Sequence, residues 1–197
     1  MNLALFDFDG TISSRDSFLL FMWHIDKVKV VGTCLSFIPQ IILYKLGRYS
    51  NQKLKETFLK KLFAGISLDE LQTASEHYCN DILPTIIRSG FWQRLAWHRQ
   101  RGDEVVVVSA SPEFMLEPWC RAHGVRLIGT EVETDNLGRL TGKLAGKNCM
   151  GHEKVRRVKT CLDIEKYDQL FTYGDTRADL PMLELAAPEN RFYKPFR

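Results

Sequence analysis

Two carboxylates stand two residues apart near the start of this chain, directly before a glycine. Asp7 and Asp9 follow the apolar run Leu3–Phe6, and Gly10 and Thr11 come next. An apolar run that ends at a glycine is typical of a buried strand, and open α/β sheets bind ligands at the carboxyl ends of their strands. Two acids this close repel each other unless one is protonated or a cation such as Mg²⁺ lies between them. The spacing therefore indicates a phosphoryl-transfer nucleophile; the alternative, an Asp-Gly hairpin turn, gives no reason for Asp7.

A second apolar run ends at a serine. The β-branched run Val105–Val108 precedes Ser109, which is therefore expected at the carboxyl end of a strand. Ser111, Pro112 and Glu113 form the pattern of an N-cap, a first-turn proline and a first-turn acid, so a helix should begin here. Free backbone N–H groups at such a helix start favour an anion. The alternative is that Ser109 is only a polar strand end, which is the commoner meaning of an isolated serine.

A third strand and a helix carry the remaining candidates. The segment Asp168–Tyr173 is typical of a strand that ends at Gly174, and Asp175 and Asp179 are spaced one turn apart at the start of a helix. Lys154 lies in the first turn of an amphipathic helix, where the helix dipole disfavours a cation. That cost is offset if Lys154 faces carboxylates and a phosphate. A solvated surface lysine is the alternative.

In this order along the chain, the four motifs resemble those of the haloacid dehalogenase superfamily of phosphatases. The resemblance spans Leu3 to about Leu185, and each motif has the strand or helix context that it requires. It implies an α/β fold class: a Rossmann-like parallel sheet core with an α-helical cap inserted after the first strand. The insertion point, with the residues around Ser111 and Lys154, resembles the phosphoserine-phosphatase-like branch, subfamily IB.

The resemblance also implies a role for each residue. The residue matching Asp7 attacks the phosphorus and forms an aspartyl-phosphate, and the residue matching Asp9 serves as general acid and then general base. Mg²⁺ would be held by Asp7, the Asp9 backbone carbonyl and Asp175, with Asp179 acting indirectly. The groups expected to bind the phosphoryl oxygens are those of Gly10, Ser109, Ala110 and Lys154. Because the second Asp is present, the resemblance favours an active phosphatase over a dehalogenase.

The composition of the chain indicates its cellular compartment and limits the kinds of partner that are expected. The chain has 197 residues, enough for one compact domain with a small insert. Its five cysteines include no C-x-x-C pair, so neither a disulfide framework nor a zinc site is predicted. The first predicted strand begins at Leu3, which leaves no room for a signal peptide, and we expect a cytoplasmic protein. A diffuse net charge of +3 gives no indication of a nucleic-acid partner.

Residues 15–88 are predicted to form an α-helical cap, and residues 1–14 and 89–197 the catalytic core. About ninety residues separate the first strand from the second apolar run, far more than one crossover helix needs, and they carry helical periodicity. The elements expected in the core are a helix from Phe91 to Arg101, strands at about 104–109, 125–130, 168–173 and 190–193, and a β-hairpin from Glu131 to Thr141.

One segment of the predicted cap is unusually apolar. Val30–Leu46 falls short of the ~20 residues of a membrane span and is interrupted by Gly32, Pro39 and Gln40. The surrounding segment Lys27–Lys61 holds eight basic residues against one acid. An apolar helix with basic flanks could rest on an anionic bilayer, at the inner face of the membrane. A helix buried within the cap, with solvated lysines around it, is the equal alternative.

The cap is expected to select the substrate. The combination of this apolar cap with the residues Gly151–Lys154 resembles the lipid-phosphate phosphatases of this branch, which implies a lipid phosphate such as phosphatidylglycerophosphate. The alternative is a small phosphorylated metabolite, as in phosphoserine phosphatase. The chain differs from phosphoserine phosphatase at Gly10, Asp16 and Ser109–Ser111, where that enzyme has Ser, Glu and Ser-Gly-Gly. Asp16 could contact a substrate ammonium or hydroxyl group, but a helix N-cap is favoured. A non-catalytic membrane- or partner-binding module would lack a motif acid, and none is missing.

Overall fold

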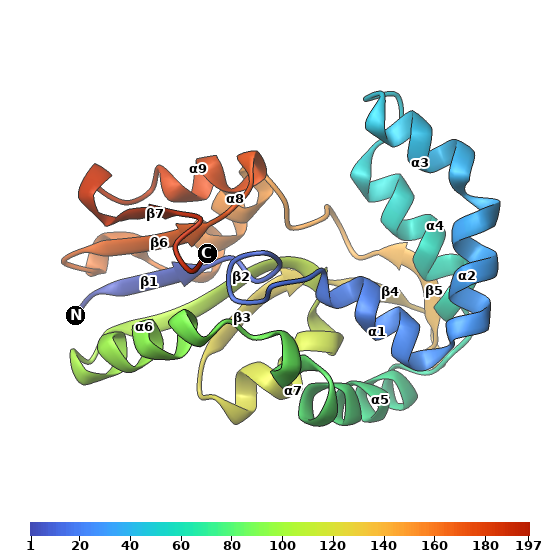
Figure 1. The fold of residues 1–197 in the computed structure, drawn as a ribbon, viewed down its shortest axis with the longest axis horizontal. Helices are drawn as coiled ribbons and strands as arrows, with labels where there is room; N and C mark the ends of the chain where they lie inside the picture. The colour runs from blue at the N-terminus through green and yellow to red at the C-terminus, as the bar shows by residue number, and fades with distance from the viewer.

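A five-stranded parallel sheet lies between helices on one side of the molecule, in the order β3-β2-β1-β6-β7 (Figure 1). The computed structural model describes residues 1–197, apart from the side chains of Ile41 and Lys45. The strands are β1 (Leu3–Phe6), β2 (Glu104–Pro112), β3 (Arg126–Thr130), β6 (Leu170–Gly174) and β7 (Arg191–Tyr193). The central strand β1 pairs with β2 and β6, and Leu3 lies opposite Glu104 and Leu170. The carboxyl ends of these three strands, which carry or directly precede the motif residues, therefore meet at one edge.

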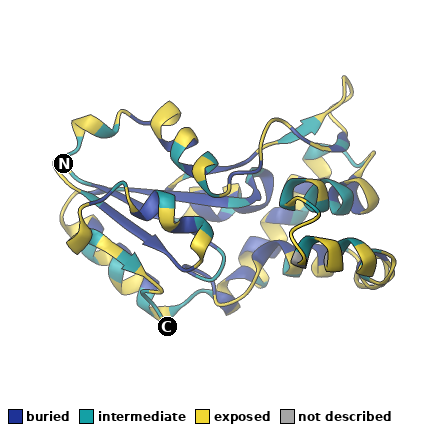
Figure 2. Ribbon diagram, turned by 90° about the horizontal axis from the view of Figure 1, so that it is seen from above, coloured by how far each residue is buried: buried dark blue, intermediate teal, exposed yellow. Residues whose placement is uncertain are grey.

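Helices cover both faces of this sheet, which is why β1 and the first half of β2 are apolar on both faces. They are α6 (Ser89–Gln100), α7 (Glu113–Ala122), α8 (His152–Cys161) and α9 (Leu180–Leu183). Ala4 and Phe6 pack into the core that contains residues of α6 and α7, whereas Leu3 and Leu5 pack with residues of α8 and α9. All four side chains are fully buried, and each large one stabilises the fold by about 1.5–3 kcal/mol. Figure 2 shows the buried strands and the exposed outer faces of the helices.

A helical insertion follows β1 and lies beyond the carboxyl edge of the sheet (Figure 1). It consists of α1 (Ser17–Ile25), α2 (Lys27–Ser36), α3 (Ile38–Lys45), α4 (Asn51–Phe63), α5 (Leu68–Asp81) and a 3₁₀ turn (Leu83–Ile86). The chain returns beside the point where it left: the Ser14 N–H donates to the Ile86 carbonyl and the Arg88 N–H to that of Ile12. The boundaries 15 and 88 for the cap stay a prediction.

The apolar segment Val30–Leu46 is divided between α2 and α3. Pro39 occupies the first turn of α3, where its missing N–H removes no helical hydrogen bond. Within the residues that the structure describes, no helix alone has the length and hydropathy needed to cross a membrane; α2 and α3 meet that test only as a pair bent by 60°. Apolar side chains of the pair that are exposed to solvent are Val28, Val31, Leu35, Ile38, Ile42, Leu43 and Leu46.

Most predicted core elements are present, with one local error. The hairpin is confirmed as antiparallel β4 (Val132–Thr134) and β5 (Leu140–Leu144). The prediction that Ser111 caps a helix is wrong, because β2 continues through Pro112 and α7 begins at Glu113 without a side-chain cap. A proline disfavours helical backbone at the residue before it, so Ser111 stays extended. After Asp175 the expected helix begins as a 3₁₀ turn (Arg177–Asp179) before α9.

Candidate active site

Asp7 stands one residue past the end of β1 and is buried. Its backbone N–H donates to the Tyr173 carbonyl at 2.9 Å, which joins the loop after β1 to β6. Gly10, with φ +89°, lies so close to the loop after β6 that a Cβ atom on it would be 2.4 Å from Asp175 Oδ2. A residue with a side chain would be strained by this backbone and would collide with the carboxylate. Glycine at this position therefore allows the two acid-bearing loops to approach each other.

Lys154 joins two of the predicted acids. It lies in the first turn of α8, and its side chain, only 2% exposed, donates to Asp7 Oδ1 and, at 2.7 Å, to Asp179 Oδ1. Burial alone would lower the pKa of this lysine, but the two carboxylates raise it above its usual value. The structure thus excludes the surface-lysine alternative. Lys154 is a charged side chain held between two acids.

Asp179 is held by hydrogen bonds on both carboxylate oxygens. Oδ1 accepts from Lys154, and Oδ2 accepts from the Thr176 hydroxyl at 2.7 Å and the Thr176 N–H at 3.0 Å. Burial would raise its pKa, but Lys154 and Thr176 hold that pKa below the usual value. Gly174 permits this arrangement, since a Cβ there would lie 2.6 Å from Asp179 Cβ. Asp179 is thereby placed to orient Lys154.

Three buried carboxylates gather at this edge, and one of their oxygens has no partner. Asp7, Asp175 and Asp179 each offer an oxygen within 4.8 Å of the others. Asp175 Oδ2 accepts from the Arg197 guanidinium at 2.7 Å, but Oδ1 is buried with no hydrogen bond from the described residues. An unpaired buried oxygen is costly unless a donor or cation is bound to it. The residues at this position therefore fit a divalent cation.

Burial of these acids also changes their protonation. Burial raises the pKa of Asp7 to about 7, although Lys154 acts in the opposite direction. The pKa of Asp175 is likewise raised by burial and by Asp179, with Arg197 opposing. A raised pKa means that burial destabilises the ionised carboxylate more than the nearby positive groups stabilise it. A bound cation would supply further positive charge.

Asp9 lies at the junction of core and cap, and its carboxylate is outside the three-acid cluster. Oδ1 accepts from the Ser17 N–H at 2.7 Å, at the first residue of α1, and Oδ2 accepts from the Ser111 hydroxyl at 2.8 Å. Asp9 thus has partners from both the cap and β2. Neither serine was identified as a partner of Asp9 from the sequence, because a serine at a strand end or helix start is too common to stand out.

Ser109 and Ala110 follow the apolar part of β2, beside Asp9. The Ser109 hydroxyl oxygen accepts from the Ser111 N–H at 3.0 Å, which leaves its own proton for another acceptor. The Ala110 carbonyl accepts from the Thr130 hydroxyl at 2.7 Å and from the Lys55 ammonium. The predicted phosphate-binding residues of β2 are therefore anchored by neighbours on β3 and on the cap.

Lys55 is the most informative residue that the sequence did not identify. It lies on α4, and its ammonium donates to the Ala110 carbonyl and, at 2.9 Å, to Asn148 Oδ1. Burial lowers the pKa of Lys55 to about 8, although Asp9 and Asp16 act to raise it. The sequence shows it as one of eight basic residues in Lys27–Lys61, with no local pattern that separates it from the solvated ones.

A cavity of about 220 Å³ between α1 and α4 contains this lysine. Its lining residues are Asp16, Phe18, Leu19, Met22, Asn51, Leu54, Lys55 and Phe58. Asp16 caps α1, as favoured from the sequence, by accepting from the Leu19 N–H at 2.8 Å. The cavity combines a cation, an acid and an aromatic wall next to Asp9. Such a cavity can accept a small polar leaving group.

The chain belongs to the haloacid dehalogenase-like hydrolase family, whose sequence model matches residues 4–184. Protein CicA of Caulobacter vibrioides is 32% identical to it over 202 residues, which cover 99% of this chain and 86% of that protein. A histidinol-phosphatase of Neisseria meningitidis serogroup C is 28% identical over 196 residues, covering 94% of this chain and 87% of that protein. The chain is thus a phosphatase of this hydrolase family.

Solved structures agree on the fold. A Bordetella pertussis Tohama I protein of unknown function superposes with a TM-score of 0.80 at 26% identity, covering 94% of this chain and 86% of that one. A phosphoserine phosphatase with a phospho-aspartyl intermediate analogue superposes with a TM-score of 0.64 at 17% identity, covering 94% and 83%. At that identity the second similarity establishes the fold alone. It is nevertheless the fold expected for the predicted branch.

Proposed function

We propose that this chain hydrolyses the phosphate monoester of a small metabolite, with Mg²⁺ as cofactor and Asp7 as nucleophile. The observation that carries the proposal is the buried cluster in which Lys154 joins Asp7 to Asp179 while an oxygen of Asp175 lies without a partner. A structural ion pair would need neither the third acid nor its free oxygen. Mg²⁺ is favoured because a set of carboxylate and carbonyl oxygens suits a hard cation.

The reaction follows from the positions of two acids. Asp7 forms a bond from a carboxylate oxygen to phosphorus while the ester P–O bond breaks, and Asp9 gives its proton to the departing alkoxide. Asp9 then takes a proton from water, the water oxygen bonds to phosphorus, and the Asp7 carboxylate is released with inorganic phosphate. The groups proposed to bind the phosphoryl oxygens are the Gly10 and Ala110 N–H groups, the Ser109 hydroxyl and the Lys154 ammonium.

The cation would be held by Asp7, Asp175 and the Asp9 backbone carbonyl. Asp179 would act indirectly, since hydrogen bonds already occupy both of its oxygens. When bound, Mg²⁺ supplies positive charge that reduces the repulsion between an attacking carboxylate and a phosphate dianion. The chain's own contribution is to hold the acids in place: Thr176 fixes Asp179, and Asp179 fixes Lys154.

A small substrate is favoured by the cap cavity beside Asp9. Its volume of about 220 Å³ is below the roughly 300–1,000 Å³ typical of sites for drug-sized ligands. Lys55 offers a cation, Asp16 an acid, and Phe18 and Phe58 an apolar wall. These groups match a leaving alcohol with polar or charged substituents. The Neisseria relative carries the name of a small-metabolite phosphatase, which supports the same class of substrate.

A lipid phosphate such as phosphatidylglycerophosphate is the second candidate. The observation in its favour is the exposed apolar surface of α2 and α3, on which Val28 is 84%, Leu35 63% and Leu46 65% exposed. Two acyl chains exceed the cap cavity, so a lipid would have to leave its tails outside it. None of the relatives described above is named for a lipid substrate. We therefore propose the small metabolite as the main substrate class.

The test replaces Asp7 with Asn, which keeps the shape of the side chain but removes the nucleophile. We expect Asp7→Asn to lower kcat by at least about 10⁴-fold on histidinol phosphate, phosphoserine or an aryl phosphate, whichever the wild type hydrolyses. Mass spectrometry of acid-quenched wild-type protein should find phosphate on the Asp7 peptide and none in the variant. The exposed Asp81→Asn is the matched control. Near-native turnover of Asp7→Asn would rule out the covalent mechanism.

The same panel should include phosphatidylglycerophosphate in detergent micelles. The metabolite proposal expects kcat/KM on a soluble ester to exceed that on the lipid by at least about tenfold. The reverse ratio would establish the lipid phosphate as the better substrate class. This comparison does not test the role of Asp7, which the Asp7→Asn variant tests separately.

A further inference from the structure

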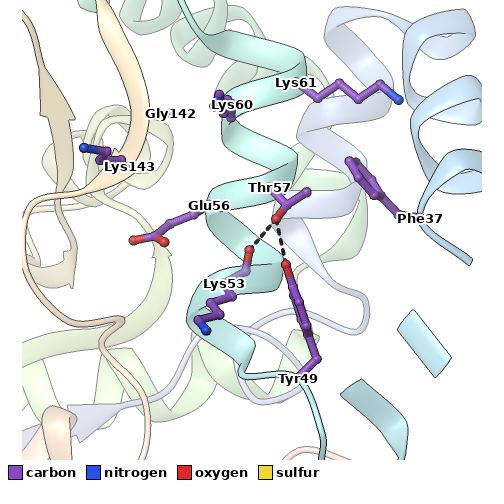
Figure 3. A pocket seen from close by; sticks show the side chains of 9 residues that line it. All are labelled: Phe37, Tyr49, Lys53, Glu56, Thr57, Lys60, Lys61, Gly142 and Lys143. Atoms are coloured by element: carbon purple, nitrogen blue, oxygen red, sulfur yellow. Dashed lines mark hydrogen bonds between the residues drawn. The ribbon is translucent and has the colours of Figure 1, made fainter. Parts of the chain in front are cut away.

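A second basic cavity lies on the cap, and none of its lining residues belongs to the acid cluster or the cap cavity described above. It has a volume of about 540 Å³. Helix α4 forms its floor, β5 flanks it on one side, and Phe37, at the junction of α2 and α3, flanks it on the other (Figure 3). We call it the α4–β5 cleft. Its lining residues are Phe37, Tyr49, Lys53, Glu56, Thr57, Lys60, Lys61, Gly142 and Lys143.

The cleft is separated from the catalytic centre by the geometry of α4. Lys53 and Lys60 are seven residues apart and lie on one face of the helix, since two turns span about 7.2 residues. Lys55, two residues after Lys53, points about 200° away, and its ammonium reaches the Ala110 carbonyl in the active site. One helix therefore presents lysines on two different faces. The charge on the cleft side has no part in the proposed reaction.

The cationic groups of the cleft lack acidic partners. Lys53, Lys60, Lys61 and Lys143 form no ion pair with any carboxylate that the structure describes. The one acid, Glu56, accepts from the Gln52 amide at 3.1 Å and from the Leu144 N–H at 3.4 Å, so it is used in joining α4 to β5. Four lysines around one cavity repel one another, and an anion would relieve that repulsion.

The walls of the cleft are held in place by the backbone. Gly142 has φ +86°, and a Cβ on it would lie 2.4 Å from Lys60 Cα, so β5 packs directly on α4 at this point. The Gly65 N–H donates to the Leu140 carbonyl at 2.8 Å, and the Leu140 N–H to that of Ile66 at 2.9 Å. These bonds join the end of α4 to the start of β5. A pre-formed cavity loses little conformational freedom when a ligand binds.

One flank of the cleft is aromatic. Phe37 packs edge-on against Phe58 at 5.5 Å, and the Lys61 ammonium lies 4.9 Å from the centre of the Phe37 ring. At the end of the cleft where α4 begins, the Tyr49 hydroxyl lies 3.3 Å from the Thr57 hydroxyl (Figure 3). The hydroxyl pair is thus already engaged, and the Lys61 ammonium also donates to the Ser36 hydroxyl. Among the described residues, Lys53, Lys60 and Lys143 remain as the ammonium donors of the cleft that have no partner. An occupant should combine negative charge with an organic part that contacts Phe37.

From the four lysines, the pre-formed walls and the aromatic flank, we propose that the α4–β5 cleft binds the phosphate group of an organic phosphate at a site distinct from the catalytic centre. Phosphate suits clustered lysines because it carries more than one negative charge and accepts from several directions. The cavity is large enough for more than the phosphate itself. A lipid headgroup or a soluble phosphate would supply the same chemistry.

The test compares two pairs of lysine substitutions in the full chain. The double variant Lys60→Gln, Lys143→Gln changes one residue on the floor and one on the β5 flank. The control, Lys159→Gln with Lys166→Gln, removes the same charge from exposed positions outside the cleft. Glutamine has nearly the helix propensity of lysine, so α4 should be unaffected. Equal thermal midpoints of the three proteins verify that the fold is retained.

Two probes distinguish the sources of phosphate. Methylenediphosphonate is titrated calorimetrically in the presence of a chelator, where hydrolysis is absent, and vesicles of phosphatidylglycerol are compared with phosphatidylcholine vesicles in co-sedimentation. We expect the cleft variant to bind at least one phosphate probe at least about tenfold more weakly than the wild type and the control. Any probe bound at the catalytic centre is common to all three proteins and does not alter the comparison.

The pattern of loss identifies the occupant. A loss confined to phosphatidylglycerol vesicles assigns the cleft to a lipid headgroup, and a loss confined to methylenediphosphonate assigns it to a soluble phosphate. Equal binding by the cleft variant and the wild type would overturn the proposal. So would a wild type that binds neither probe at low salt, where screening is least. None of these outcomes depends on Asp7 or on turnover.

Discussion

The catalytic edge of the core and the outer surface of the cap differ in how their side chains are satisfied. At the edge, Asp7, Lys154 and Asp179 are buried and held by one another, so each position is determined by its neighbours. On α2 and α3, Leu35 and Ile42 are exposed to solvent. Removal of a partner from a buried ionic network is costly, whereas exposed side chains tolerate change. The chemistry should therefore be sensitive to single substitutions in the core, and selectivity should be adjustable in the cap.

The largest effect is expected at the proposed metal site. We expect Asp175→Ala to raise the Mg²⁺ concentration needed for half-maximal activity by at least about 100-fold, because it removes one of few anionic ligands from a cation that gives up its water reluctantly. Activity is measured against Mg²⁺ concentration, with a chelator as the zero point. Activity that persists in excess chelator would remove the metal from the mechanism.

A smaller effect is expected at Lys55, which brings the cap to the catalytic edge. Lys55→Met should lower kcat/KM by about 10–100-fold, the value of a hydrogen bond to a charged group, with most of the change in KM. Lys55→Arg should restore part of the loss. Equal kcat/KM for the wild type and Lys55→Met would assign Lys55 to the fold instead of the substrate.

The lowered pKa of Lys55 predicts that kcat/KM depends on pH. A lysine with a pKa of about 8 carries its charge below that pH and loses it above. The kcat/KM of the wild type should therefore fall as the pH rises through about 8, whereas Lys55→Arg should stay flat there, because an arginine keeps its charge. A fall of equal size in both proteins would place the titrating group elsewhere.

Beneath the catalytic edge, a buried histidine couples stability to pH. His98 Nδ1 lies 2.8 Å from Asp103 and Nε2 lies 2.9 Å from the Tyr173 hydroxyl. Burial lowers the pKa of His98 despite Asp103, so the unfolded chain binds its proton at a higher pH than the folded one. The free energy of unfolding should then decrease as pH falls below 6.5, the ordinary pKa of histidine, towards the lower folded value.

Urea unfolding at several pH values checks this coupling. In His98→Gln the slope of unfolding free energy against pH should be shallower, on top of a loss of about 1–3 kcal/mol from unpaired buried groups. The exposed His77→Gln should keep the wild-type slope. A slope that survives in His98→Gln would exclude this histidine as its source.

The smallest effect is expected on the exposed surface of the cap. Leu35→Gln with Ile42→Gln should change the free energy of unfolding by less than about 0.5 kcal/mol per site and leave hydrolysis of a soluble ester unchanged. The buried Leu59→Ala, also in the cap, should lose about 2–5 kcal/mol. A loss of activity on a lipid phosphate alone by the double variant would support the lipid as the substrate class. A loss on both substrates would contradict the expected difference between the core and the cap.

The fold class and the order of the motif residues could be predicted from the amino-acid sequence. The apolar runs before Asp7 and Ser109 predict buried strands. The glycines after Asp9 and Tyr173 predict where the first strand and the strand Asp168–Tyr173 end. These features are local: they depend on side-chain type and backbone freedom over a few residues. Parallel strands then bring their carboxyl ends to one edge wherever each lies in the sequence. The acid cluster was predictable for this reason.

Which polar groups contact one another could be seen only in the folded chain. Ser111 was predicted as a helix cap and instead lies in β2, where its hydroxyl donates to Asp9. Lys55 resembled its solvated neighbours in sequence, yet its ammonium donates to the Ala110 carbonyl in β2 and to Asn148, which is 93 residues further along the chain. Likewise, the exposure of Leu35 and Ile42 depends on how α2 and α3 pack. Such contacts join residues far apart in sequence, and no local pattern encodes them.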